Sequence, residues 1–503
     1  MDSFDFVIVG AGTAGSVLAA RLSEDPYNRV LLVEGGAPTG PPAMSVPAAW
    51  PTLIGSEVDW GYATVPQRGL DHHVLPYPRG KVYGGSSSIN AMAFLRGHRD
   101  NYDEWARGGA TGWGYDDLLP YFKRSETAAP GRDPYYRGTS GPMRVAPAPR
   151  VNEISYAYHA AAIQAGHPVS EDLNGKQPEG VAWLEMNIVD GLRQSAADGY
   201  LRPILGRANL TVVPNAVVRR LTFAGDRCTG IEYVTGGRVV QARADREVVL
   251  SAGAVGTPKL LLISGIGPAH HLRERGLWVR TDLPGVGSGL QDHPLSGITY
   301  AAAKPVPAAI NNHSDLVSQL RSRPGLVAPD VQITFMDIAY YPPGTTGPAQ
   351  GYTIVFSLMR PHSRGTVRLA SDDPAAAPLI DPNFLSDRRD VETMVAALRL
   401  AREAGETPAM SEWRGAEAIP GPETDSDEAL ARYVRSTVSP FFHAAGTCRI
   451  GTDSLAVVDP QLRVHGVQGL RVADASVMPA LTGANPNATV YAIGEKASAL
   501  LLQ

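Results

Sequence analysis

The stretch FDFVIVGAGTAGSVLAARL, residues 4–22, decides the expected fold. Its first part is apolar and β-branched, as in a buried strand, and its last part has the apolar spacing of a helix. Three glycines, Gly10, Gly12 and Gly15, lie between the two. They would permit a tight turn, the approach of a pyrophosphate to the backbone, and close packing of helix on strand.

A second strand, RVLLVE, follows this helix and ends at Glu34. Glu34 lies about 20 residues after the glycines, where a carboxylate can accept a hydrogen bond from a ribose hydroxyl. Residues 4–34 therefore predict a Rossmann-type unit that binds a dinucleotide. A glycine-rich turn that binds no nucleotide is the alternative interpretation.

Composition excludes several classes of protein. The 45 Lys and Arg against 50 Asp and Glu give a net charge of -5, so we expect no nucleic-acid partner. Two cysteines, Cys228 and Cys448, predict neither a disulfide framework nor a metal site. No export signal or apolar run of about 18 residues is evident. We therefore expect a cytoplasmic protein without a membrane partner.

A chain of 503 residues is too long for one compact core. Further strands are predicted within 209–223, 230–253 and 469–476, and alternating runs between 300 and 365 suggest a second, antiparallel sheet. We predict an α/β fold with two interwoven domains. The Rossmann-type domain comprises residues 1–155, 196–300 and 440–503, and the other, an antiparallel sheet with helices, comprises 156–195 and 301–439.

Four other stretches are ambiguous when each is taken alone. RGKVYGGSSSINAMAFLRG (79–97) has small residues against which a flat ring could lie, or is an ordinary turn. GAVGTPKLLLISGIG (253–267) fits a helix that starts at a proline and stops at a glycine. Asn487 lies in the first turn predicted for the C-terminal helix, where it could be a capping amide. His443, in FFHAAGTCRIG (441–451), is either a core histidine or a base.

Together these stretches resemble the glucose-methanol-choline (GMC) family of FAD-dependent alcohol oxidoreductases. GKVYGGSSSINAMAFLRG is similar to its first signature and GAVGTPKLLLISGIG to its second. Within the family, the chain is most similar to choline-dehydrogenase-like and 5-(hydroxymethyl)furfural-oxidase-like bacterial members. The resemblance implies that the Rossmann-type domain binds FAD and the other binds the substrate. It implies FAD contacts at Gly10, Gly12, Gly15, Glu34, Gly85, Asn90, Met92, Val217, Asp474 and Asn485.

The resemblance also implies a catalytic pair, His443 and Asn487, on the substrate side of the flavin. Their role would be to oxidise an alcohol to the aldehyde by hydride transfer to flavin N5, with His443 as base and O₂ or another compound as electron acceptor. The expected substrate is a primary, uncharged and partly apolar or aromatic alcohol, in a pocket walled by Phe94, Phe441 and Phe442. A redox-neutral or light-driven lyase or decarboxylase on the same scaffold is the alternative.

Two positions depart from the pattern of the family. Ile89 stands where some members attach FAD covalently through a histidine, so we expect a non-covalent flavin. Gly289, in GVGSGLQDHP (285–294), stands where the family usually has asparagine, so whatever that amide holds is not expected here.

Overall fold

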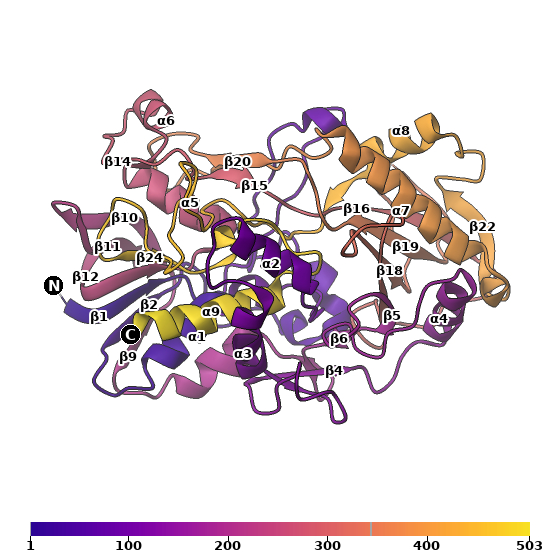
Figure 1. Cartoon of the computed structure of the whole chain (residues 1–503), viewed down its shortest axis with the longest axis horizontal. Coiled ribbons are helices and arrows are strands. Elements are labelled where there is room, and N and C mark those ends of the chain that lie inside the picture. The colour runs from indigo at the N-terminus through magenta and orange to yellow at the C-terminus, as the bar shows by residue number, and fades with distance from the viewer. Residues whose placement is uncertain (1, 343–344) are drawn as a thin grey trace.

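The computed structural model describes residues 2–342 and 345–503 and has one large sheet near each end of its long axis (Figure 1). The first sheet has the order β10-β11-β12-β1-β2-β9, and β24 also pairs with β12. Its strands are β1 (Asp2–Val9), β2 (Val30–Val33), β9 (Leu210–Val213), β10 (Ala216–Ala224), β11 (Arg227–Thr235), β12 (Arg238–Leu250) and β24 (Leu470–Val472). The pairs of β1 with β2 and β12, of β2 with β9 and of β12 with β24 are parallel, which confirms the predicted Rossmann-type sheet.

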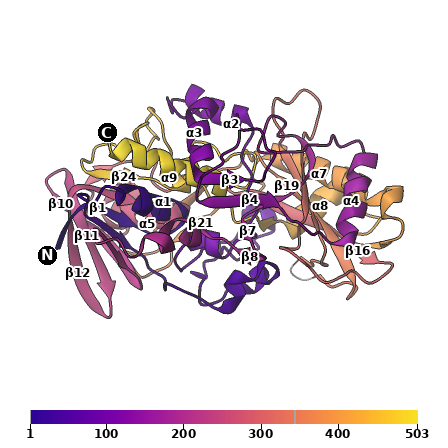
Figure 2. The same cartoon turned by 90° about the horizontal axis from the view of Figure 1, so that it is seen from below.

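Two helices from opposite ends of the chain cover one face of this sheet. They are α1 (Thr13–Leu22), which connects β1 to β2, and α9 (Asn487–Leu501), the C-terminal helix. The helices pack against each other, as both views show (Figures 1 and 2). Nearly all residues of both are buried, because each lies between the sheet and other elements. The start of α9 is thereby brought to the start of α1.

The second sheet is antiparallel in every described pair, as predicted. Its order is β22-β16-β19-β18-β17-β5, with β23 beside β16. The strands are β5 (Gly180–Trp183), β16 (Pro294–Ala302), β17 (Leu316–Leu320), β18 (Val331–Met336), β19 (Gly351–Leu358), β22 (Arg414–Ile419) and β23 (Ser439–Pro440). Helix α7 (Arg388–Glu406) lies over this sheet and packs on α8 (Asp427–Thr437) and α4 (Glu153–Gln164) (Figure 1).

The boundaries between the two sheets differ from the predicted ones at two places. Helix α4 crosses the predicted limit at residue 155, and its Ile154 and Tyr158 belong to the core beneath the second sheet. Strand β16 starts at Pro294, so the limit at residue 300 falls inside a strand of the second sheet. Both errors have the same cause: sequence patterns do not reveal which core an apolar face enters.

Helix α5 (Gly253–Ile263) begins before Pro258 rather than at it. Proline has no N–H to donate to the carbonyl four residues earlier, which here is Ala254. Thr447 Oγ1 donates to that carbonyl oxygen instead, at 2.8 Å. The compensation lets the helix continue through the proline and ties it to the stretch that contains His443.

Smaller elements complete the structure, and Figure 2 shows two of them, β3 and β4, between the two large sheets. They are β3 (Glu126–Ala128), β4 (Met143–Pro147), β6 (Glu185–Met186), β7 (Ile188–Val189), β8 (Leu192–Arg193), β13 (Ile266–Gly267), β14 (Thr281–Asp282), β15 (Ser288–Leu290), β20 (Gly365–Arg368), β21 (Leu379–Asp381), α2 (Arg99–Arg107), α3 (Tyr115–Ser125) and α6 (Ala269–Glu274). Within the described ranges, no helix combines the length and apolarity needed to cross a bilayer.

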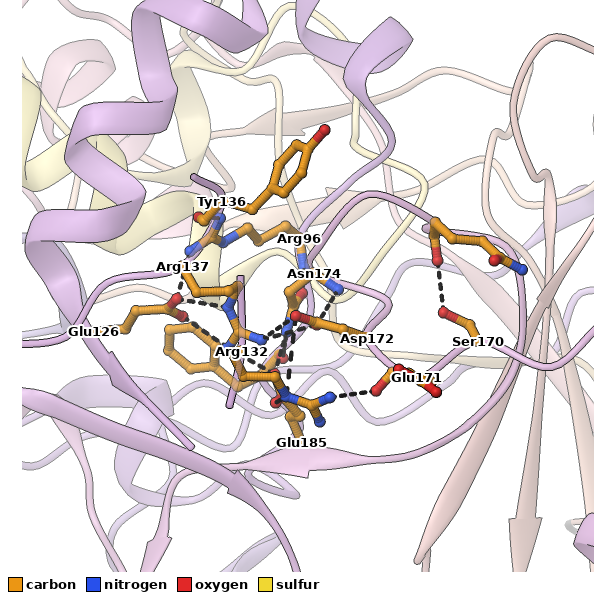
Figure 3. A network of polar contacts seen from close by, with 12 residues as sticks. Arg96, Glu126, Arg132, Tyr136, Arg137, Ser170, Glu171, Asp172, Asn174 and Glu185 are labelled. Carbon is orange, nitrogen blue, oxygen red and sulfur yellow. Dashed lines mark hydrogen bonds and ion pairs between the residues drawn. The ribbon is translucent and has the colours of Figure 1, made fainter. Parts of the chain in front are cut away.

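A network of ion pairs, mostly buried, joins β3 and β6 to the end of the first signature (Figure 3). Its members are Arg96, Arg132, Arg137, Glu126, Asp172 and Glu185. Arg137 is 1% exposed and binds three carboxylates, so each of these buried charges is compensated by its partners in the network. Asn174 accepts from the Arg96 N–H at 2.6 Å and donates to the Phe94 carbonyl oxygen. The network thus fixes residues 94–96.

Candidate functional site

The glycine turn between β1 and α1 has the geometry that the sequence predicted. Gly10 has φ +98°, and a Cβ on Gly15 would lie 1.8 Å from the Gly10 carbonyl oxygen. For a Cβ on Gly12, the nearest described atom, the Ser251 carbonyl oxygen, would be 4.0 Å away. Gly12 is also the N-cap of α1, so its lack of a side chain leaves the N–H groups of the first helical turn open to an anion.

Glu34 follows β2 and lies directly against this turn. Its Oε2 accepts from the Ala11 N–H at 2.8 Å, and its Oε1 accepts from the Gly36 N–H at 2.7 Å. Burial nevertheless raises the pKa of its carboxyl to about 7. Each oxygen keeps further acceptor capacity, which a ribose hydroxyl could use.

The first signature packs on the glycine turn. A Cβ on Gly85 would lie 2.8 Å from the Cα of Gly12, so these two glycines are in close contact. Asn90 Oδ1 accepts from the Met92 N–H at 3.0 Å and from Arg193 at 2.9 Å, and the Met92 side chain is fully buried. The Asn90 oxygen and the Met92 side chain therefore face protein, and the predicted contacts of these two residues would use other atoms.

Val217 and Asp474 are two further predicted FAD contacts, and both lie outside the glycine turn and the first signature. Val217 is on β10, is 38% exposed, and lies beside Gly35. The Asp474 carboxylate accepts from the Gly253 N–H at 2.9 Å, from Thr257 Oγ1 at 2.6 Å and from the Ser476 N–H at 2.8 Å. The side chain of Asp474 is thus committed to the start of α5 and to its own turn, so only its backbone remains for a cofactor.

His443 is held where two distant segments run antiparallel. Gln291 and Ala445 exchange backbone hydrogen bonds at 3.0 Å, and the Phe441 N–H donates to the His293 carbonyl oxygen at 2.9 Å. This pairing places Nδ1 of His293 2.9 Å from Nδ1 of His443. His443 is half-buried. Its Nδ1 is therefore occupied by the contact with His293, and its Nε2 lies on the opposite side of the ring.

The structure places a different asparagine from the predicted Asn487 against His443. Asn485 Nδ2 lies 3.3 Å from His443 Nε2, and Asn485 Oδ1 is buried without a hydrogen-bond partner among the described residues. Asn487 instead accepts from Thr13 Oγ1 at 2.7 Å, at the start of α1. Pro486 separates the two asparagines: Asn487 is the first helical residue, whereas Asn485 precedes the helix and points elsewhere.

The predicted aromatic wall is only partly present. The Phe441 ring stacks on the imidazole of His443, with ring centroids 4.4 Å apart, and Phe441 and Phe442 are half-buried. Phe94 is 1% exposed and stacks on Tyr491 of α9 in the core. Phe94 therefore has no surface to offer a substrate, and that prediction is wrong.

Both histidines are neutral near pH 7. Burial lowers the pKa of His293 to about 3. Burial also lowers the pKa of His443 to well below 6.5, and the positive charge of Arg79 acts in the same direction. A neutral imidazole has one N–H and one lone pair, so one Nδ1 of the pair donates to the other.

Sequence reasoning missed three residues around His443: Arg79, Asp292 and His293. Arg79 donates to the Phe442 carbonyl oxygen, and Asp292 accepts from the His443 N–H. The sequence signal for Asp292 and His293 was QDHP, residues 291–294, a polar run directly before an apolar strand. Of the stretch that contains it, only Gly289 entered the prediction. Gly289 itself has φ +77°, a region that asparagine also tolerates, so its backbone role needs no amide.

Two glycine variants should separate folding from cofactor binding. We expect Gly15→Ala to destabilise the protein by roughly 1–3 kcal/mol, because its Cβ would overlap the Gly10 carbonyl oxygen. Gly12→Ala, whose Cβ has room in the protein, should keep the melting temperature of the cofactor-free protein but weaken dinucleotide binding. Melting curves and cofactor titrations of both variants test this, and equal melting temperatures would contradict it.

A nucleotide-binding turn at the start of α1, beside a histidine–asparagine pair held between two sheets, defines a dinucleotide-dependent oxidoreductase. Residues 4–295 and 361–494 match the N-terminal and C-terminal sequence models of GMC oxidoreductases, and the chain belongs to that family. It is therefore an FAD-dependent alcohol oxidase or dehydrogenase.

Relatives cover almost the whole chain. The oxygen-dependent choline dehydrogenase of Rhizobium etli is 40% identical over 98% of this chain and 94% of its own. The mitochondrial choline dehydrogenase of Homo sapiens is 39% identical over 99% and 90%. The crystal structure of pyridoxine 4-oxidase from Mesorbium loti superimposes with a TM-score of 0.96, at 37% identity over 99% of this chain and 98% of its own.

Proposed function

We propose that this enzyme oxidises a primary, uncharged alcohol with an apolar or aromatic part to its aldehyde, and that His443 accepts the hydroxyl proton. The observation that carries the proposal is the pair of His443 Nε2 and Asn485 Nδ2, 3.3 Å apart, which can both bind one oxygen. Phe441, stacked on the imidazole, supplies an apolar surface beside it. The proposal modifies the predicted catalytic pair by replacing Asn487 with Asn485.

The residues at the first sheet fit a non-covalent FAD. The open space at Gly12, the free N–H groups of α1 and the remaining acceptor capacity of Glu34 suit a pyrophosphate and a ribose. Ile89, at the position of covalent attachment, is packed with Leu53, Val58 and Val82. When bound, the cofactor accepts the hydride at N5 and passes two electrons to O₂ or another acceptor. Release of all yellow colour from the denatured chain tests the non-covalent attachment.

The tautomer of His443 determines whether it can act as a base. If His443 Nδ1 donates to His293 Nδ1, then His443 Nε2 carries the lone pair, and the Asn485 amide nitrogen faces it as a donor. In that arrangement Nε2 takes the hydroxyl proton, and the Asn485 amide donates to the resulting alkoxide. Proton removal favours loss of hydride from the adjacent carbon, because an alkoxide stabilises the developing carbonyl.

The aromatic rings near His443 favour an uncharged substrate. Arg79 contributes a positive charge that lowers the pKa of His443, but the carboxyl of Asp292 lies against the same histidine, so these two charges do not select a cation. Phe441 and Phe442 are the accessible predicted walls and suit an aromatic or aliphatic group. Choline is nevertheless the necessary control, because aromatic rings also attract cations and the sequence relatives are choline dehydrogenases.

Anaerobic mixing with a panel of alcohols tests the function. We expect benzyl-type, furan or pyridine methanols to bleach the flavin, with formation of the corresponding aldehyde. A lyase or decarboxylase would leave the flavin yellow. Turnover of choline or glucose with none of the aromatic alcohols would overturn the proposed substrate class. Repeating the experiment in air, with detection of peroxide, then distinguishes O₂ from another acceptor.

The rate of flavin reduction should decrease on the acid side only below pH 6.5. The free base of His443 is the active form, and its pKa lies well below 6.5 because burial and Arg79 disfavour the cation. The rate of flavin reduction should therefore remain constant from pH 8 to 6.5 and fall only at lower pH. Protonation of Asp292, whose pKa burial raises to about 6, would add to this fall. Stopped-flow reduction across this range tests it, and a midpoint above pH 7 would contradict it.

A further inference from the structure

The peptide group that joins Phe442 to His443 is held at both polar ends by charged side chains. Arg79 Nη2 donates to the Phe442 carbonyl oxygen at 2.7 Å, and the His443 N–H donates to Asp292 Oδ1 at 2.6 Å. Hydrogen bonds of this charge-assisted kind are shorter and stronger than neutral ones. Two residues that are distant in sequence therefore fix the orientation of one peptide plane.

That peptide follows a residue in a costly conformation. Phe442 has φ +66°, in the left-handed region that bulky residues rarely adopt, at a cost of roughly 1–3 kcal/mol. Such a conformation persists only where surrounding groups hold it. A return of Phe442 to negative φ would turn the following peptide and break at least one of the hydrogen bonds to Arg79 and Asp292. The same turn would move the imidazole of His443.

The groups that hold His443 divide the task between its backbone and its side chain. Asp292, which is 2% exposed, binds the backbone N–H, while its chain neighbour His293 binds the imidazole. The guanidinium of Arg79 is itself held over the ring of the buried Tyr77, 5.0 Å from the ring centroid. Neither Arg79 nor Asp292 needs to touch the substrate to affect His443.

We propose that Arg79 and Asp292 form a peptide clamp that positions His443 for proton transfer. The clamp keeps Phe442 in its left-handed conformation and so directs His443 Nε2 toward the position shared with Asn485. Arg79 and Asp292 are therefore positioning residues, and this inference rests on the proposed role of His443 as the base. An offset of about 1 Å at a reacting group can lower a rate about 10²-fold. Loss of the clamp should thus slow flavin reduction far more than it weakens FAD binding.

Paired variants of the FAD-loaded enzyme test the clamp with an alcohol that bleaches the wild type. We expect Arg79→Met and Asp292→Ala to slow flavin reduction roughly 10- to 100-fold per bound FAD. Arg79→Lys and Asp292→Asn keep a donor and an acceptor, and should restore the rate to within several-fold of the wild type. Arg435→Met is the matched control, because Arg435 also donates to a backbone carbonyl, that of Gly69, at 2.9 Å. It should change the melting temperature but not the rate.

A background without the imidazole separates this inference from the proposed function. In His443→Ala, adding Arg79→Met should cause no further loss of rate, because the clamp acts only through His443. If His443→Ala is slow but Arg79→Met reduces its flavin at the wild-type rate, the clamp is wrong and the base stands. If Arg79→Met slows His443→Ala by the same factor as it slows the wild type, the clamp is also overturned. Normal reduction by His443→Ala overturns both. If Asp292→Ala fails to fold, the Arg79 variants alone decide.

Discussion

His443→Ala is expected to slow flavin reduction by roughly 10² to 10⁴-fold, the usual contribution of a positioned general base. Without the imidazole, no group at this place takes the hydroxyl proton, so hydride must leave from the neutral alcohol. The variant should still bind FAD, because the substitution leaves the glycine turn and Glu34 unchanged. The side-chain contacts that it removes are those of His443 with His293, Asn485 and Phe441. Stopped-flow reduction by one efficient alcohol measures the effect.

The competing explanation for His443 is a packing role in the core. In that case, the alanine variant would lose stability while its bound flavin is reduced at a near-normal rate. Melting temperature and FAD content, measured on the same samples, distinguish these cases. A destabilised His443→Ala enzyme that remains fully reducible would end the catalytic interpretation.

Asn485→Ala is expected to slow flavin reduction by roughly 10² to 10³-fold, the effect of losing one donor to a developing negative charge. The structure assigns this effect to Asn485 because its Nδ2 lies 3.3 Å from His443 Nε2. Water can replace part of the lost hydrogen bond, which is why the effect should be smaller than that of His443→Ala.

Asn487→Ala is the matched control for Asn485→Ala. Asn487 accepts a hydrogen bond from Thr13 between α9 and α1, so its loss should cost about 1 kcal/mol of stability. Reduction per bound flavin should stay close to that of the wild type. Slow reduction in Asn487→Ala together with normal reduction in Asn485→Ala would reverse the assignment and restore the pairing predicted from sequence.

Local patterns in the sequence were sufficient for the first sheet. The glycine spacing requires a turn in which Gly10 has positive φ and Gly15 has no Cβ, and the structure has both features. The predicted strands of both sheets are also present, because apolar alternation depends on residues only two positions apart. The start of α5 was missed, because the group that compensates for Pro258 is Thr447, far away in the sequence.

The two asparagines mark the limit of what a motif can show. Asn485 and Asn487 flank Pro486, and the resemblance implied a catalytic role for Asn487 and an FAD contact for Asn485. Their side chains diverge because Asn487 has already entered the helix, while Asn485 lies before it. Phe94 shows the same limit: its place in the first signature suggested the pocket, but Tyr491 of α9 covers it.

The sequence by itself determined the fold class and the glycine turn with Glu34, because each depends on residues that are close together in the chain. His443 was singled out as the candidate base only by the resemblance to the family. Only the tertiary structure decided which groups surround that base. Arg79, Asp292, His293 and Asn485 reach His443 from different segments. The physical reason is that these hydrogen bonds form where antiparallel pairing and a strained turn bring distant segments together, and no local spacing of residues encodes that meeting.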